Sequence, residues 1–165
     1  MILNKLKKNF FVNSSIILLI FLLDRISKVY CIYLSDKISS NEIFFSKYLN
    51  IYLTWNDGIA FGMLSFNESY LYNILTIVIL IVIVALMFMT INTGGFKKYS
   101  MLMILGGAFG NVFDRIFYNA VPDFIDFHVG NFHWFIFNIA DIFISLGIFF
   151  MIFFEIIGNS EDKLK

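Results

Sequence analysis

Residues 69–96 read SYLYNILTIVILIVIVALMFMTINTGGF and contain no charged side chain. A helix that crosses a lipid bilayer needs about 20 consecutive apolar residues, so this stretch is long enough to span a membrane. The rest of the chain shares this character, because 59% of its 165 residues are hydrophobic and only 15% are charged. A soluble domain of this size exposes too much surface to hide such a composition. The sequence therefore predicts an integral membrane protein that forms a single domain over residues 1–165.

Three further charge-free stretches predict three more helices, although each is shorter. They are residues 9–23, residues 99–113, and residues 127–140, the last of which continues past Asp141 to residue 154. Each must include neighbouring charged residues to match the width of a bilayer. We therefore expect four transmembrane helices, at residues 9–30, 69–92, 99–117 and 136–157.

The connection between the first two helices, residues 35–68, is too long for a tight turn, and long connections are usually functional. Its segment YLNIYLTW, residues 48–55, is rich in residues that suit a half-buried strand. The predicted fold is an all-α membrane protein of four transmembrane helices. A small periplasmic β-sheet subdomain is expected between helices 1 and 2, with Trp55 at the depth of the lipid headgroups.

Lysines near the ends of the spans predict the orientation, because Lys and Arg favour the cytoplasmic side of a membrane. With four spans, the N-terminal tail, the connection between the second and third helices and the C-terminal tail fall on one side, and they contain Lys5, Lys7, Lys8, Lys97, Lys98, Lys163 and Lys165. The segment 119–134 on the other side contains no Lys or Arg. We therefore expect a multi-pass protein of a bacterial inner membrane with both termini in the cytoplasm.

Charged and polar residues in or near the spans should gather at the outer ends of the helices. They are Asp24, Arg25, Lys28, Asp114, Arg115, Asp123, Asp126 and Asp141, joined by Asn56, Asn111 and Asn138. A charge at the centre of a bilayer costs ~2.5–3.5 kcal/mol on insertion scales, so such residues usually pair, face inward or function. One pole of the predicted bundle is therefore polar and ionisable.

Ion pairing explains some of these charges. Asp24 and Lys28 are four residues apart on one helix and can pair directly, and Asp114 can bridge to a neighbouring helix. The remaining acids, Asp123, Asp126 and Asp141, have no obvious basic partner. Two aspartates brought together without a cation share one proton and can activate water, as in aspartic proteases. From spacing alone, a proton relay and structural hydrogen bonding remain open beside such a dyad.

Other kinds of site find less support. His128 and His133 are five residues apart in an aromatic segment, a poor spacing for a helical metal pair, so we expect packing or hydrogen bonding from them and no metal. Cys31 is the only cysteine, which excludes an intrachain disulfide. The net charge of zero argues against a nucleic acid partner.

Five motifs, taken together and in order, resemble one family, the lipoprotein signal peptidases or signal peptidase II. They are DRISK (24–28), NDGIAFG (56–62), GGAFGNVFDR (106–115), VPDFIDF (121–127) and FNIAD (137–141). The resemblance implies that Asp123 and Asp141 are the catalytic pair, and gives Asp126 no catalytic part; we expect it to form hydrogen bonds at the rim. It also implies support from Asn56, Asn111, Arg115, Asn138, Asp24 and Lys28. Gly110 and its neighbouring glycines allow close approach of either a helix or a peptide.

The resemblance implies a membrane aspartyl endopeptidase that removes signal peptides from diacylglyceryl-modified bacterial prolipoproteins, cleaving before the lipid-modified cysteine. It would act as a monomer, contact membrane lipid and need no cofactor, and a loop with Trp55 and Phe61 would clamp the substrate. The sequence leaves open which aspartate is the acid and which the base. The alternatives are a small proton- or ion-conducting protein, which predicts acids at several depths of the bilayer, and a non-catalytic scaffold.

Overall fold

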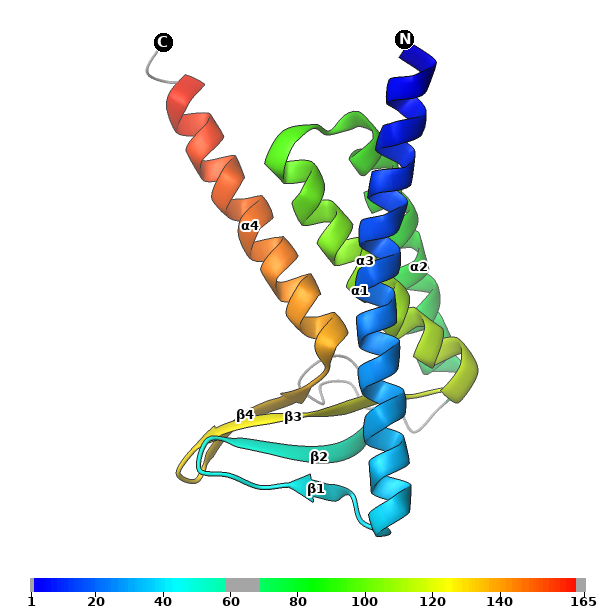
Figure 1. Ribbon diagram of the computed structural model, residues 1–165, viewed down its shortest axis with the longest axis vertical. Helices are drawn as coiled ribbons and strands as arrows, with labels where there is room; N and C mark the ends of the chain where they lie inside the picture. The colour runs from blue at the N-terminus through cyan, green and yellow to red at the C-terminus, as the bar shows by residue number, and fades with distance from the viewer. Residues whose placement is uncertain (1, 59–68, 163–165) are drawn as a thin grey trace.

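The computed structural model describes residues 2–58 and 69–162, and these form helices packed against one antiparallel sheet. The helices are α1 (Ile2–Ile38), α2 (Ser69–Asn92), α3 (Gly95–Tyr118) and α4 (Ile139–Asp162). The strands are β1 (Glu42–Phe44), β2 (Leu49–Asn56), β3 (Val121–Val129) and β4 (Phe132–Phe137). Figure 1 shows the sheet across one end of the helix bundle, whereas α1 begins and α4 ends at the opposite end.

The second predicted helix agrees with the structure at both ends, since α2 also covers residues 69–92. Among the described residues, two helical segments are apolar and long enough to cross a membrane by length and composition, Tyr72–Asn92 and Ile139–Ile157. The predicted fourth span, residues 136–157, begins too early. Ile136 and Phe137 lie in β4, where they are paired with Asp126 and Ile125 of β3.

Helix α1 is longer than the span predicted within it. Its 37 residues extend over about 55 Å at the usual rise of an α-helix, well beyond the thickness of a bilayer core. The last turns continue past residue 30 because they pack against the sheet, where Cys31 joins Leu53 and Phe124 in a buried cluster. The helix ends where Ser39 adopts a left-handed conformation with φ 53°.

The sheet corrects the predicted fold. Its order is β1-β2-β3-β4 with antiparallel neighbours, so half of it comes from residues 121–137 and not from the connection 35–68. The predicted small sheet is present, and the chain is mostly helical, but the sheet is not confined to the connection between helices 1 and 2. Residues 127–137, expected as the apolar start of the fourth helix, form the end of β3, a turn and β4 instead. An aromatic, charge-free run suits a buried helix or a strand equally well. Gly130, with φ 59°, provides the turn between β3 and β4.

Helix α3 packs against the other three helices, and glycines allow its close approaches to α1 and α4. A β-carbon at Gly107 would collide with the carbonyl oxygen of Ala140 in α4, and one at Gly106 would lie 2.7 Å from the β-carbon of Ile20 in α1. These contacts confirm close helix packing as one role of the glycine motif. They bring the middle of α1, the middle of α3 and the start of α4 together.

Candidate active site

Asp123 lies in the middle of the sheet, on β3 opposite Thr54 of β2, and is almost fully buried. Both of its carboxylate oxygens accept hydrogen bonds from side-chain amides. Asn56 at the end of β2 donates to Oδ2 at 2.8 Å, and Asn138 donates to Oδ1 at 2.6 Å. Neighbouring strand ends and the residue before α4 therefore fix the orientation of this carboxylate.

Asp141 lies in the first turn of α4 and forms a reciprocal cap with Asn138. The backbone N–H of Asn138 donates to Oδ2 of Asp141, and the backbone N–H of Asp141 donates to Oδ1 of Asn138, each at 3.1 Å. This is the arrangement of a capping box, which satisfies two otherwise unpaired donors at the start of a helix. Asn111 of α3 donates to the other oxygen, Oδ1, at 2.8 Å. Asn138 thus contacts both aspartates that the sequence predicts as a pair.

The electrostatic environment of the pair favours a shared proton. Burial of Asp123, reinforced by the nearby charge of Asp141, raises the pKa of the Asp123 carboxyl to about 7, although hydrogen bonds from Asn56 and Asn138 oppose the shift. Within the described residues, neither aspartate forms an ion pair with a basic side chain. Near neutral pH, one carboxyl group can therefore hold a proton beside an ionised one.

A buried ionic network lies beside the pair, between the second half of α1 and the second half of α3. Lys28 is fully buried and its Nζ contacts Asp24 at 2.9 Å, Asp114 at 2.7 Å and Asn111 Oδ1 at 2.8 Å. These contacts confirm the predicted Asp24–Lys28 pair and the bridge from Asp114 to a neighbouring helix, where Arg25 also contacts Asp114. Asn111 accepts from Lys28 and donates to Asp141, so it joins the network to the pair.

The network also holds the start of α4 in place. Oδ1 of Asp24 accepts the backbone N–H of Ala140 at 3.0 Å, and a β-carbon at Gly110 would collide with Asp24. Gly110 is therefore the position at which α3 leaves room for a carboxylate of α1. The sequence did not predict the contact between Asp24 and Ala140. Its donor is a backbone N–H, which every residue except proline has, so the residue type gives no indication of it.

Arg115 is not brought into contact with the aspartates. It donates from Nη2 to the backbone carbonyl of Gly58 at 2.7 Å and stacks over the ring of Tyr72. Its Nε and Nη1 are buried and have no hydrogen-bond partner among the described residues. The expected turn after β2 is present, since Asn56 Oδ1 accepts the N–H of Gly58 at 2.9 Å. Phe61, the other half of the predicted clamp, lies outside the described residues.

Asp126 forms the hydrogen bonds that we expected, with partners that sequence reasoning did not identify. Asn50 of β2 donates to Oδ2 at 3.1 Å, and His133 Nδ1 lies 2.9 Å from both oxygens. Asn50 stands opposite Asp126 in the sheet. Asn50 within the predicted strand 48–55 was a signal that this strand holds a polar partner. The sequence did not show that Asp126 would lie opposite it, because the pairing of β2 with β3 was not predicted.

Two hollows open beside the pair. One, of about 340 Å³, is lined by Asp123, Trp55 and Asn56, and another, of about 270 Å³, is lined by Asp141 and Ile142. Trp134 and Phe135 of β4 line both. The two hollows thus share an aromatic lining, with one aspartate in each. The acids gather at the sheet end of the bundle, an arrangement that does not support a proton relay across a membrane.

Comparisons with known proteins identify the family of the chain. A family model described as "Signal peptidase (SPase) II" matches residues 16–157. The lipoprotein signal peptidase of Pelagibacter ubique (strain HTCC1062) is 47% identical over 154 residues, which cover 93% of each chain. That of Aquifex aeolicus (strain VF5) is 36% identical over 151 residues, covering 90% of this chain and 88% of the relative. A solved structure described as "Bacterial membrane enzyme structure by the in meso method at 2.3 A resolution" matches with a TM-score of 0.75 and 27% identity over 93% of each chain.

Proposed function

The chain belongs to the signal peptidase II family, and on this premise we propose that it removes signal peptides from lipid-modified bacterial prolipoproteins by activating water between Asp123 and Asp141. The aspartic peptidase activity follows from the family. The single observation that carries the assignment of the pair is Asn138, which contacts both carboxylates. No other two acids in the described residues share a neutral side-chain partner in this way. Trp134 and Phe135 line the hollows beside both of them.

The proposed mechanism uses one ionised and one protonated carboxyl group. The ionised aspartate takes a proton from a water molecule, whose oxygen attacks the carbonyl carbon of the scissile peptide bond. The protonated aspartate donates a hydrogen bond to the carbonyl oxygen and later helps to protonate the leaving amine. A pKa of about 7 at Asp123 keeps a substantial protonated fraction in the pair near neutral pH.

The supporting residues fall into two groups in this proposal. Asn56, Asn111 and Asn138 hold the carboxylates through amide donors, so they act as positioning residues. Arg115 has two buried donors without a partner in the described residues, and we assign them to a backbone carbonyl of the substrate. Donors arranged in advance in a dry site are effective at stabilising developing charge.

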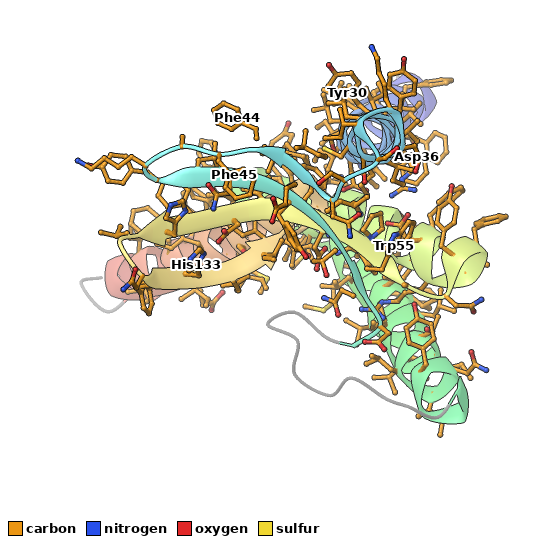
Figure 2. The ribbon with its side chains drawn as sticks, turned by 90° about the horizontal axis from the view of Figure 1, so that it is seen from below. Tyr30, Asp36, Phe44, Phe45, Trp55 and His133 are labelled. Carbon is orange, nitrogen blue, oxygen red and sulfur yellow. The ribbon has the colours of Figure 1, made fainter. Side chains whose placement is uncertain are left out.

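The proposed placement in the membrane puts four helices across the bilayer and the sheet on its outer surface. Ile81, Phe88 and Ile91 of α2 expose most of their side chains, which a lipid environment would cover. Figure 2 shows the sheet from its outer side, where Phe44, Phe45 and Trp55 expose aromatic rings suited to the headgroup region. The lysine pattern and the common end of the two termini in Figure 1 support cytoplasmic termini, and the proposed enzyme acts as a monomer.

The test is cleavage of a diacylglyceryl-modified prolipoprotein by the purified full chain in detergent. Asp123→Asn and Asp141→Asn should each lower the rate at least ~10³-fold, since loss of one member of a catalytic unit removes most of its effect. Asp36→Asn, an exposed aspartate at the end of α1, is the matched control and should cleave at the native rate. Thermal unfolding checks that each variant is folded.

The outcomes separate the competing functions. A folded Asp123→Asn or Asp141→Asn variant with near-native cleavage would remove that residue from the catalytic pair. A native chain that fails on a substrate cleaved by a related peptidase would contradict the substrate assignment. A non-catalytic scaffold predicts that neither substitution matters.

A further inference from the structure

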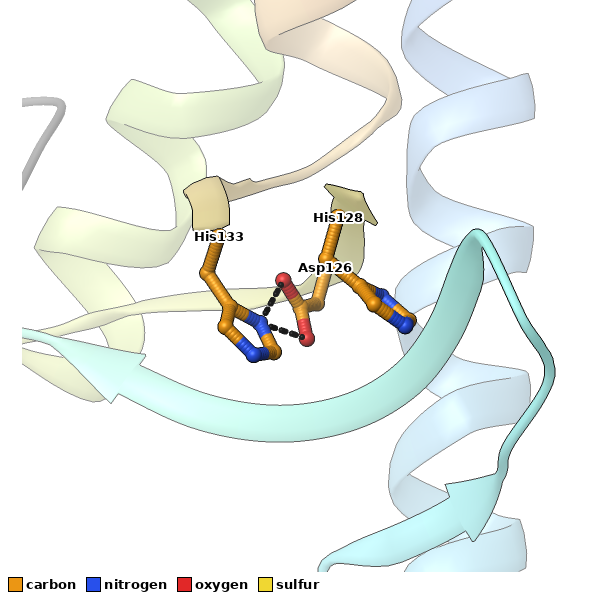
Figure 3. A group of neighbouring side chains, drawn as sticks. All are labelled: Asp126, His128 and His133. Carbon is orange, nitrogen blue, oxygen red and sulfur yellow. Dashed lines mark hydrogen bonds and ion pairs between the residues drawn. The ribbon is translucent and has the colours of Figure 1, made fainter. Parts of the chain in front are cut away.

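A cluster of possible metal ligands lies on the β3–β4 hairpin, apart from the catalytic pair. His128 on β3 stands directly opposite His133 on β4, and Asp126 precedes His128 by two residues on the same strand. One ligand atom from each of the three side chains can be chosen so that all lie within 4.8 Å of one another. Figure 3 shows the His133 ring facing the Asp126 carboxylate, with His128 beside them.

A hydrogen bond between Asp126 and His133 explains only part of this cluster. The two imidazole rings stack, with centroids 4.9 Å apart and planes inclined by 18°. Nδ1 of His128 is buried and has no hydrogen-bond partner among the described residues. A buried polar atom without a hydrogen-bond partner carries a free-energy cost if it stays unsatisfied. A ligand that accepts electrons from this nitrogen would remove that cost.

We infer that Asp126, His128 and His133 bind a divalent first-row transition metal ion, with zinc as the expected occupant. Two imidazoles and one carboxylate are ligands that suit zinc, whereas Mg²⁺ and Ca²⁺ prefer a larger set of oxygen ligands. Tetrahedral coordination at bond lengths of about 2.0–2.1 Å places ligand atoms about 3.3 Å apart. Small side-chain rotations therefore convert the observed cluster into a metal site. His133 is largely exposed, which leaves the fourth position for water.

The residues around the cluster support this role. Asn50 donates to Oδ2 of Asp126 at 3.1 Å and so orients the carboxylate, as residues behind a metal ligand commonly do. The metal would join β3 to β4 one residue pair before Val129 and Phe132, the last pair of the hairpin. Trp134, next to His133, lines both hollows beside the catalytic pair. The site is thus a clasp on the hairpin that lines these two hollows, and its residues take no part in water activation.

The experiment uses the full chain purified in detergent and freed of metal. Titration with Co²⁺, followed by its visible absorption, should show one tightly bound ion per chain, displaced by Zn²⁺, and Zn²⁺ should raise the melting temperature. The variant His133→Asn keeps an amide donor near the position of Nδ1, and thus the contact with Asp126, but removes the imidazole. It and His128→Asn should each weaken metal binding at least ~10-fold. An Asp123→Asn/Asp141→Asn double variant should bind as the native chain does.

Each result decides for or against the clasp. The chain contains two histidines and one cysteine, so loss of binding in both histidine variants assigns the metal to this hairpin. Absence of saturable Co²⁺ or Zn²⁺ binding by the native chain would overturn the inference. So would binding that survives both histidine substitutions, or binding that is lost only in the double aspartate variant.

Discussion

Asn138 and Asp141 exchange two hydrogen bonds of 3.1 Å at the start of α4, each backbone N–H donating to the other side chain. The same Asn138 donates its amide to Asp123 at 2.6 Å. The residue that begins the helix therefore also sets the relation between the two carboxylates of the proposed catalytic pair. Helix capping and catalysis should be separable, because they use different atoms of Asn138.

The first prediction separates these two functions. Asn138→Ser keeps an oxygen that can cap the helix but removes the donor to Asp123, whereas Asn138→Ala removes both. We expect Asn138→Ala to lose about 1 kcal/mol of stability through the cap, and Asn138→Ser to lose much less. Both should cleave substrate at least ~10-fold more slowly, since a misplaced catalytic group is costly. Thermal unfolding and cleavage rates measure the two effects, and a fully active Asn138→Ser would contradict the positioning role.

The second prediction concerns the pH dependence of stability. The Asp123 carboxyl has a folded-state pKa of about 7, above its ordinary value of 3.8. Between these values the folded chain holds a proton that the unfolded chain has released, so native stability falls as pH rises from about 4 to 7. Asp123→Asn removes this dependence. Its stability relative to the native chain should therefore rise over that window by up to about 4 kcal/mol and then level off.

Unfolding in detergent at several pH values between 4 and 8 measures this difference. The informative quantity is the slope of this stability difference against pH. The substitution also changes the hydrogen bonds to Asn56 and Asn138, but that effect does not vary with pH and so does not contribute to the slope. A stability difference that stays flat between pH 4 and 7 would show that Asp123 ionises normally.

The third prediction tests the close approach of α3 to α1. Gly110→Ala places a β-carbon against the carboxylate of Asp24 and 3.0 Å from its Cγ, so Asp24 must move. Because Asp24 also holds Lys28 and the N–H of Ala140, we expect a loss of about 1–3 kcal/mol and reduced cleavage. Gly94→Ala is the control, since no atom lies within 4 Å of its added carbon. Equal stability of the two variants would show that the site tolerates the displacement of Asp24.

The fourth prediction concerns the buried cation. Lys28→Met leaves Asp24 and Asp114 with less compensating charge in a fully buried site, which should cost about 3–5 kcal/mol. Lys97→Met breaks a partly exposed pair with Glu155 and should change stability by less than about 1 kcal/mol. Chemical denaturation in detergent compares them. Adding Asp114→Asn to Lys28→Met should recover part of the loss, and strictly additive effects would argue against direct coupling.

The sequence by itself determined the class of protein and much of the site. An apolar composition and a long charge-free run required helices suited to a bilayer, because such residues have no other way to avoid water. The spacing of Asp24 and Lys28 required them to share a helix face, and the structure confirms their contact. The sequence also showed that Asp123 and Asp141 have no Lys or Arg close to them in the chain.

Only the tertiary structure decided the hairpin of β3 and β4 and the partners that it creates. Residues 127–137 fit a helix or a strand by local preference, and pairing of β3 with β2 selects the strand. The contacts of Asn138 with Asp123, of Asp24 with the N–H of Ala140, and of His133 with Asp126 depend on that choice. Tertiary packing determines which residues that are distant in the chain become hydrogen-bond partners. The local sequence around each residue does not contain this information.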